Sequence, residues 1–318
     1  MFRPRAANPN GPLWLDLSKE ETVQFRSSLI EKIITTFSPD ALVVDYLPYG
    51  LRNELLATLL NVRTRKYLLL RGIVDSADYE LREILASTDL AAIYDRLLIA
   101  ADRRVIEPLE DLPLSASTKA KCEWIGYMTH NGVVSQSVRS TNAIDRDTVW
   151  VVCSAGSGLR GEALFSECIR VASKHPTVFF DIVLGTRSRL THADFGALPG
   201  NLRLSQLRTD LPALHAAADI VITSGGYNSL LEAATGGAEL IVCPVNQGMK
   251  DEQIRHARQL QAFYPLTIAD DPVDIGPLLQ KAVANAQSHR TLELALETEG
   301  IRNARDIIMR DLTSVVSA

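Results

Sequence analysis

The chain has 318 residues, of which 46% are hydrophobic and 22% are charged, and its formal net charge is -5. This length allows two domains with separate cores, and the negative charge argues against a broad nucleic-acid-binding surface. No apolar run is long enough to cross a bilayer, the first residues lack the apolar core of a signal peptide, and the four cysteines have no metal-binding spacing. We therefore expect a cytoplasmic protein with free thiols, no nucleic-acid partner and no transmembrane segment.

Strands and helices alternate along nearly the whole chain, which predicts parallel sheets with helices on both faces. In the first half we predict helices at Lys19–Phe37, Leu51–Leu60 and Tyr79–Leu85, and strands at Ala41–Asp45, Arg65–Leu70, Ala91–Tyr94, Arg96–Ile99 and Cys122–Ile125. The segment Ser135–Asp147 is polar and nearly without large apolar residues, which indicates a linker between two domains.

The second half has a clearer strand and helix pattern than the first. The predicted strands are Thr148–Cys153, Val178–Leu184, Leu202–Leu204, Asp219–Ile222, Leu240–Cys243 and Pro265–Ile268. The predicted helices are Glu162–Ser173, Leu211–Ala217, Ser229–Thr235 and Asp251–Leu260, and a long amphipathic segment, Pro277–Leu312, ends the chain. We expect one domain over residues 1–140 and a second over residues 141–318.

Two loops in the second half have the form of phosphate-binding loops. The strand that ends at Ile222 is followed by Ser224-Gly225-Gly226 and then immediately by a helix, so backbone N–H groups and a positive helix end face the sheet edge. Ser154–Gly158 follows another strand in the same way. Glycines are also needed wherever a strand turns sharply into a helix. Two such loops nevertheless favour a nucleotide or nucleotide-sugar ligand.

Several segments carry a family resemblance. Asp210–Glu232, Leu240–Pro244 and Asp251–Ala257 resemble the C-terminal domain of GT-B glycosyltransferases, and are similar to the lipid II N-acetylglucosaminyltransferase group. Pro39–Arg52, which contains Asp45-Tyr46-Leu47-Pro48-Tyr49-Gly50, resembles a branch of that group known mainly as predicted glycosyltransferases. The resemblance implies an α/β fold of two Rossmann-like domains facing a cleft. It also implies metal-independent transfer of a sugar from a nucleotide diphosphate to an acceptor hydroxyl or amine, with a UDP-sugar as the favoured donor and no further cofactor.

Within this resemblance, residues 1–140 correspond to the acceptor-side domain and residues 141–318 to the donor-binding domain, whose C-terminal helix packs back on the first. Related enzymes begin with a strand and a Gly-rich loop, often Gly-Gly-x-Gly-His, and Met1–Lys32 contains nothing of that form. We therefore expect an incomplete first domain that a partner chain or a second copy completes. Two alternatives remain: a nucleotide-sugar-binding subunit or sensor without transfer activity, and a sugar-nucleotide 2-epimerase, which shares the fold.

The candidate donor-binding residues follow from the two loops and from the resemblance. The diphosphate is assigned to Gly156, Ser157, Gly158, Ser224, Gly225, Gly226, Asn228 and Ser229, with Arg160 as a neutralising cation. The resemblance implies that Glu232 binds the ribose, that Glu252 and Gln253 bind the sugar, and that Leu207 and Arg208 border the base through backbone atoms. Each charged member of the set also has a plain structural interpretation, as a solvated helix residue or a partner of the helix dipole.

Other polar residues have weaker assignments. Asp45 ends a strand at the edge where open α/β sheets place ligands, so it is the candidate acceptor-side base, although it also suits a turn cap over Tyr46–Gly50. His215 lies in an Ala-rich helix and is expected to be a packed or capping residue, and His256 is expected on a solvated helix face. No Asp-x-Asp pair at a strand end indicates a metal site.

Overall fold

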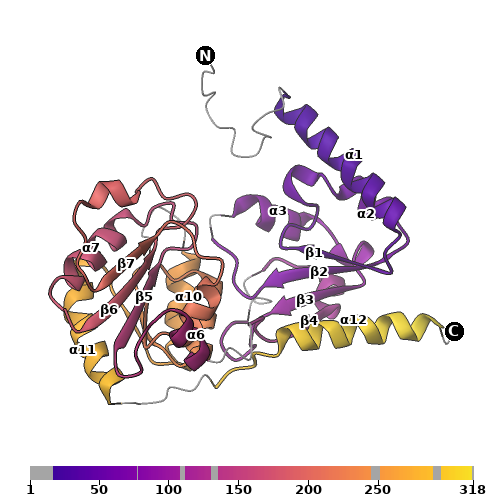
Figure 1. Ribbon diagram of the computed structural model, residues 1–318. Coiled ribbons are helices and arrows are strands. Elements are labelled where there is room, and N and C mark those ends of the chain that lie inside the picture. The colour runs from indigo at the N-terminus through magenta and orange to yellow at the C-terminus, as the bar shows by residue number, and fades with distance from the viewer. Residues whose placement is uncertain are drawn as a thin grey trace.

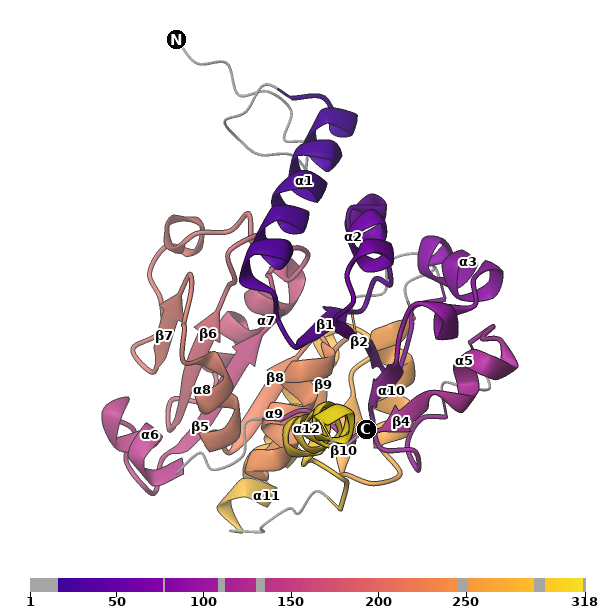
Figure 2. The ribbon, with the colours of Figure 1, turned by 90° about the vertical axis from the view of Figure 1, so that its right-hand side faces the viewer.

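The computed structural model describes residues 17–76, 78–107, 112–129, 135–244, 251–288 and 295–316. Figure 1 shows two α/β units beside each other, and Figure 2 shows their sheets from the side. The strands described in the first unit are β1 (Ala41–Asp45), β2 (Arg65–Arg71), β3 (Arg96–Ala100) and β4 (Cys122–Trp124). Its helices are α1 (Lys19–Phe37), α2 (Leu56–Asn61), α3 (Tyr79–Ser87) and α5 (Ala116–Ala120).

The strands of the first unit pair in parallel in their sequence order, β1-β2-β3-β4. Because right-handed crossovers in one direction place their helices on one side of a sheet, α2 and α3 pack on the same face. Leu59 of α2 and Leu81 of α3 belong to one core cluster with Leu68 and Leu97 of the strands. The opposite face of this sheet is left for another element.

In the second unit the described strands are β5 (Val149–Ser154), β6 (Val178–Val183), β7 (Leu202–Ser205), β8 (Ile220–Thr223), β9 (Glu239–Val242) and β10 (Leu266–Ile268). The helices are α6 (Ser135–Thr141), α7 (Glu162–Ala172), α8 (Leu211–Ala217), α9 (Tyr227–Gly236), α10 (Glu252–Leu260) and α11 (Ile275–Gln287). The sheet is parallel, with the strand order β10-β9-β8-β5-β6-β7. Every residue of β5 and β8 is buried, as expected for central strands covered on both faces.

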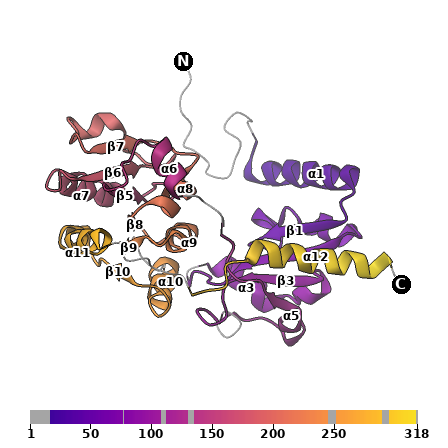
Figure 3. The same ribbon diagram turned by 60° about the horizontal axis from the view of Figure 1, so that its bottom comes forward.

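The chain returns to the first unit at its C-terminal end. Helix α12 (Gly300–Val316) lies across the first sheet, well away from α11 (Figure 3). Its Ile307 packs with Tyr67, Leu98 and Ile125 on the sheet face that α2 and α3 leave open. Upstream of α12, the backbone N–H of Tyr127 donates to the carbonyl oxygen of Glu297 at 2.7 Å, so the two connections between the units run together.

The structure corrects four sequence predictions about secondary structure. Leu51–Leu60 is not one helix: a 3₁₀ turn ends at Asn53, because Arg52 and Asn53 have φ values of 55° and 64°, and α2 begins later. Ala91–Tyr94 is not a strand, since Leu90–Ala92 forms a 3₁₀ turn capped by Asp89.

The other two corrections concern a helix inside the expected linker and the division of the C-terminal amphipathic segment. The expected linker Ser135–Asp147 contains α6, whose Val138 packs on the core of the second unit. The C-terminal amphipathic segment Pro277–Leu312 is two helices, α11 and α12, on different units.

Candidate functional site

In the second sheet, β5 and β8 are neighbours. The chain runs from β5 through β6 to β7 on one side, and from β8 through β9 to β10 on the other, so the strand order reverses between β5 and β8. Open α/β sheets bind ligands outside the carboxyl ends of their strands at such a switch point. The loops at this point are 154–158, after β5, and 224–226, after β8, which are the two predicted phosphate-binding loops. The sequence prediction therefore placed both loops at the position that the topology favours for a ligand.

Close backbone packing determines the shape of these loops. Gly158 has a φ of 82°, and a Cβ atom there would lie 1.8 Å from the carbonyl oxygen of Leu184. Gly225 has a φ of 87°, and its Cβ would lie 2.9 Å from Cγ1 of Val242. Gly156, with a φ of 58°, and Gly226 would meet no atom within 4 Å. Gly158 and Gly225 are thus required by the fold, whereas the surroundings of Gly156 and Gly226 leave space for a ligand.

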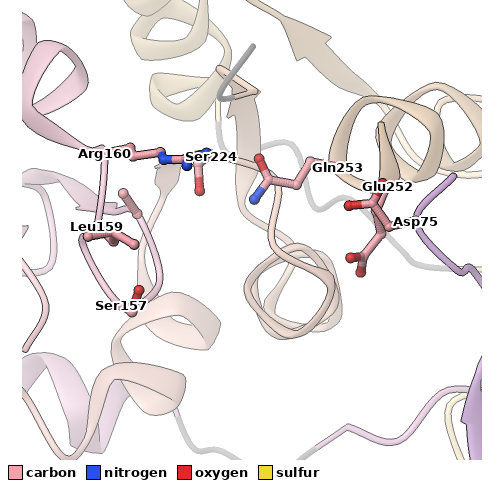
Figure 4. Close-up of a pocket in the computed structure, with 8 residues that line it drawn as sticks. Asp75, Ser157, Leu159, Arg160, Ser224, Glu252 and Gln253 are labelled. Atoms are coloured by element: carbon pink, nitrogen blue, oxygen red, sulfur yellow. The ribbon is translucent and has the colours of Figure 1, made fainter. Parts of the chain in front are cut away.

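The two loops share one cavity with the start of α10 and with the first unit. This cavity, of ≈ 280 Å³, is called here the loop cavity, and it is lined by Asp75, Ala155, Ser157, Leu159, Arg160, Ser224, Glu252 and Gln253. Figure 4 shows Ser157, Leu159 and Arg160 on one side of it and Gln253, Glu252 and Asp75 on the other. Five predicted donor-binding residues therefore meet here, although their sequence positions span nearly a hundred residues.

Backbone donors and one cross-domain cation shape the electrostatics of this region. The N-cap of α9 is Gly226 and that of α10 is Asp251, and neither caps its helix with a side chain. Both helix ends therefore present the positive end of the helix dipole toward the site. Nη1 of Arg71, in β2, lies 3.9 Å from Oε1 of Glu252. The same guanidinium group stacks over the ring of Tyr46, with 5.5 Å between the guanidinium carbon and the ring centroid.

A second cavity, of ≈ 330 Å³, lies between the two units and is called here the interdomain cavity. Its polar lining is Asp45, Arg71, Thr129, Asn228 and Glu232, and its apolar lining is Leu69, Ala100, Met128, Tyr227 and Ile301. The candidate base Asp45 and the candidate ribose ligand Glu232 thus line the same cavity, from different units. Glu232 does not line the loop cavity, so the predicted donor residues divide between two neighbouring cavities.

Seven predicted site residues line neither of these cavities: the four loop glycines, Gly156, Gly158, Gly225 and Gly226, together with Leu207, Arg208 and Ser229. The side chain of Leu207 is 57% exposed. Arg208 is committed to structure, because it donates to Asp210 at 2.8 Å and to Asn142 at 2.7 Å. Ser229 is half-buried one residue beyond Asn228. The side chains of Leu207 and Arg208 therefore give no information on the base of a nucleotide.

Two histidines have contacts that the sequence pattern did not indicate. His215, expected to be packed or capping, is fully buried between Ser154 and Glu232. The expectation of a solvated His256 is wrong: this ring stacks on Tyr227 with centroids 5.0 Å apart, and its Nε2 lies 3.4 Å from Oη of Tyr127. Burial lowers the pKa of His256 to about 4. The reason is tertiary, since His256 packs against Tyr227 of α9 and against Tyr127 instead of facing solvent.

Among the described residues there is no group of three or more His, Cys, Asp or Glu side chains placed to hold a metal ion. None of the described helices is both long enough and apolar enough to span a membrane.

Comparison with known proteins finds a family match in the second half of the chain. Residues 183–308 match the family model of the glycosyltransferase family 28 C-terminal domain. A stretch of 155 residues is 27% identical to the UDP-N-acetylglucosamine--N-acetylmuramyl-(pentapeptide) pyrophosphoryl-undecaprenol N-acetylglucosamine transferase of Legionella pneumophila (strain Corby). This match covers 48% of the chain and 42% of that protein, so the chain spans less than half the length of the curated relative it matches.

Solved structures share the whole two-unit arrangement. The UDP-GlcNAc 2-epimerase from Neisseria meningitidis superposes with a TM-score of 0.62 at 14% identity, covering 97% of this chain and 84% of that one. The glycotransferase of kitacinnamycin superposes with a TM-score of 0.58 at 15% identity, covering 94% and 81%. At these identities the likeness establishes the fold alone. The expected fold, GT-B with two Rossmann-like domains, and the resemblance to GT-B glycosyltransferases are both confirmed.

Proposed function

Because residues 183–308 match a glycosyltransferase family 28 C-terminal domain within a GT-B fold, we propose that this chain transfers a sugar from a nucleotide diphosphate to an acceptor hydroxyl or amine. The observation that carries this proposal is the loop cavity. It brings both switch-point loops, the cation Arg160 and the Glu252-Gln253 pair around one space.

In this proposal the second domain binds the donor. The diphosphate lies against Ser157 and Ser224–Gly226, where the N-terminus of α9 and Arg160 offset its negative charge. The sugar extends toward Glu252 and Gln253, whose side-chain oxygens accept hydrogen bonds from its hydroxyls. The ribose lies beside Glu232. A UDP-sugar is the favoured donor, since the relative in Legionella carries that nucleotide sugar in its name.

The first domain supplies the acceptor side. Asp45 lines the interdomain cavity from the end of β1, and we assign it the removal of the acceptor proton as general base. The acceptor oxygen or nitrogen then forms the new bond to the anomeric carbon, while the bond from that carbon to the diphosphate oxygen breaks. Backbone N–H groups and Arg160 stabilise the negative charge of the leaving diphosphate without a metal ion in this proposal.

The binding step is tested by calorimetric titration of the protein with UDP, GDP and dTDP. We expect saturable binding of one nucleotide, weakened by about 1–3 kcal/mol in Glu232→Ala because a hydrogen bond to a charged group is lost. Glu239→Ala is the matched control, since Glu239 is the first residue of β9 and lies at the amino ends of the strands, away from the carboxyl ends that carry the proposed site.

Three outcomes separate the candidate activities when the matching nucleotide sugar is added. Release of the nucleoside diphosphate together with a glycosylated acceptor supports transfer. Conversion of the sugar while it stays attached to the nucleotide indicates an epimerase, and tight binding without conversion indicates a binding subunit. Absence of binding by all three nucleotides would contradict the proposal itself.

A further inference from the structure

A buried chain of hydrogen bonds connects the two halves of the proposed donor site. Oγ of Ser154 lies 3.0 Å from Nε2 of His215, and Nδ1 of His215 lies 2.9 Å from Oε2 of Glu232. Ser154 is the last residue of β5, His215 lies in α8 and Glu232 in α9. Three elements that are distant in the sequence are thus joined directly behind the switch point.

The order Ser, His, carboxylate is that of a hydrolytic triad, but burial rules out nucleophilic attack here. Ser154 and His215 are both 0% exposed, so no substrate reaches the serine oxygen. Only Glu232, whose side chain is 16% exposed, reaches the interdomain cavity. The chain of contacts therefore ends at a group that faces the interdomain cavity, and the other two members lie behind it.

The partners determine the direction of each hydrogen bond. An ionised carboxylate only accepts, so Nδ1 of His215 carries the proton and donates to Glu232. In a neutral ring Nε2 is then an acceptor, and the hydroxyl of Ser154 donates to it. Within the described residues, Oε1 of Glu232 has no hydrogen-bond partner. One carboxylate oxygen is thus held from behind while the other remains available to the cavity.

We propose that His215 is a positioning residue for nucleotide recognition: its Nδ1–H fixes the carboxylate of Glu232 so that the second oxygen accepts from the ribose hydroxyls. This inference rests on the proposed function. Fixing the rotamer in advance removes an ordering cost that a free glutamate side chain would incur on binding. Ser154, at the other ring nitrogen, holds the ring in the orientation that points Nδ1–H at Glu232.

Two substitutions separate positioning from packing, because each preserves one ring nitrogen. In His215→Asn the amide nitrogen takes the place of Nδ1 and retains the donor toward Glu232. In His215→Gln the amide nitrogen takes the place of Nε2 and donates to Oγ of Ser154, so that contact is retained with the hydroxyl as acceptor, and the donor to Glu232 is lost. Both remove the ring, so a purely structural role predicts similar effects for the two variants.

The readout is the ratio of the dissociation constants of 2′,3′-dideoxy-UDP and UDP, titrated into the same protein. The analogue lacks both ribose hydroxyls, so the ratio reports their recognition independently of overall stability. If the protein prefers GDP, the corresponding guanosine pair replaces these ligands. We expect a ratio of about tenfold in the unchanged protein, corresponding to one hydrogen bond to a charged group.

His215→Asn is expected to keep this ratio within about threefold of the unchanged protein, whereas His215→Gln brings it to about one. Equal ratios in the two variants would overturn the inference. If either variant does not fold, Ser154→Ala is used: without its partner at Nε2 the ring is not held in the orientation that points Nδ1–H at Glu232, so the ratio falls, and an unchanged ratio overturns the inference. Absence of UDP and GDP binding by the unchanged protein would instead overturn the proposed function.

Discussion

At the scale of single residues, the loop after β5 depends on a glycine that the fold itself requires. Gly158 approaches the chain after β6 so closely that a Cβ atom would overlap the carbonyl oxygen of Leu184 at 1.8 Å. Gly156, two residues earlier, has a positive φ as well but open space around it. The pair therefore separates the effect of close packing from the effect of backbone conformation.

We expect Gly158→Ala to destabilise the protein by about 2 kcal/mol more than Gly156→Ala, because only the first forces backbone segments apart. Urea unfolding of the two variants measures this difference. Equal losses of unfolding free energy in the two variants would show that close packing at Gly158 does not determine the loop.

The buried His256 makes stability depend on pH. Its folded-state pKa of about 4 lies below the usual histidine value of 6.5, so the unfolded chain binds the proton more tightly. The histidine therefore reduces stability as pH falls from 6.5 to 4, by about 3 kcal/mol in total. His256→Phe keeps a ring against Tyr227 and is expected to lack this part of the pH dependence. Unfolding free energies at pH 7 and pH 4.5 test it, and identical pH profiles for the two proteins would contradict the assignment.

A single substitution also tests the role of general base assigned to Asp45. If it removes the acceptor proton, Asp45→Asn lowers kcat by a factor of about 10²–10⁴ and leaves the nucleotide affinity unchanged. Asp40→Asn serves as the control, because Asp40 is exposed just before the other end of the same strand. A kcat for Asp45→Asn equal to that of the control would remove Asp45 from the mechanism.

At the scale of elements, α12 completes the core of the first domain from the far end of the chain. Arg96 of β3 donates to both carboxylate oxygens of Asp311, at 2.6 and 2.9 Å. These hydrogen bonds hold the pKa of Asp311 below its usual value of 3.8, although burial opposes them. Because the folded-state pKa is depressed, the stabilisation is present at neutral pH and is lost as pH falls below 3.8.

We expect Asp311→Ala to lower the free energy of unfolding by about 2–3 kcal/mol at pH 7, since two charge-assisted hydrogen bonds are lost and Arg96 loses a partner. The comparison variant is Asp306→Ala, which removes an exposed carboxylate from the same helix. Thermal unfolding gives the midpoint temperatures of the two variants, which are then compared. A midpoint for Asp311→Ala that equals that of Asp306→Ala would mean that the pair contributes nothing measurable.

Elements with a local signal were predictable, and those that depend on tertiary contacts were not. The strand-Gly-helix units at β5 and β8 carry their pattern in consecutive residues, so both loops were found from the sequence. Helix α6 was missed because its stability comes from Val138 on a distant core and from Arg139, whose Nη1 lies 3.0 Å from Asp219. The partnership of His215 with Ser154 and Glu232 was missed for the same reason.

At the scale of the whole molecule, direct contacts hold the two domains together around the site. Both the backbone N–H and the hydroxyl of Ser76 donate to the carboxylate of Asp251, at 3.0 and 2.7 Å. Arg255 donates to the carbonyl oxygen of Val74 at 3.3 Å. The hydroxyl of Tyr227 donates to the carbonyl oxygen of Ala100. Asp251 directly precedes the candidate sugar ligands Glu252 and Gln253. These contacts therefore attach the first turn of α10, which carries those two side chains, to the first domain.

The central claim, that the switch-point loops hold the diphosphate of a nucleotide donor, is tested most directly by a crystal structure of the protein with UDP. The account predicts diphosphate oxygens within hydrogen-bond distance of the backbone at Ser224–Gly226 and of Ser157, with the ribose beside Glu232. A diphosphate bound elsewhere on the molecule, with the loop cavity empty, would contradict it.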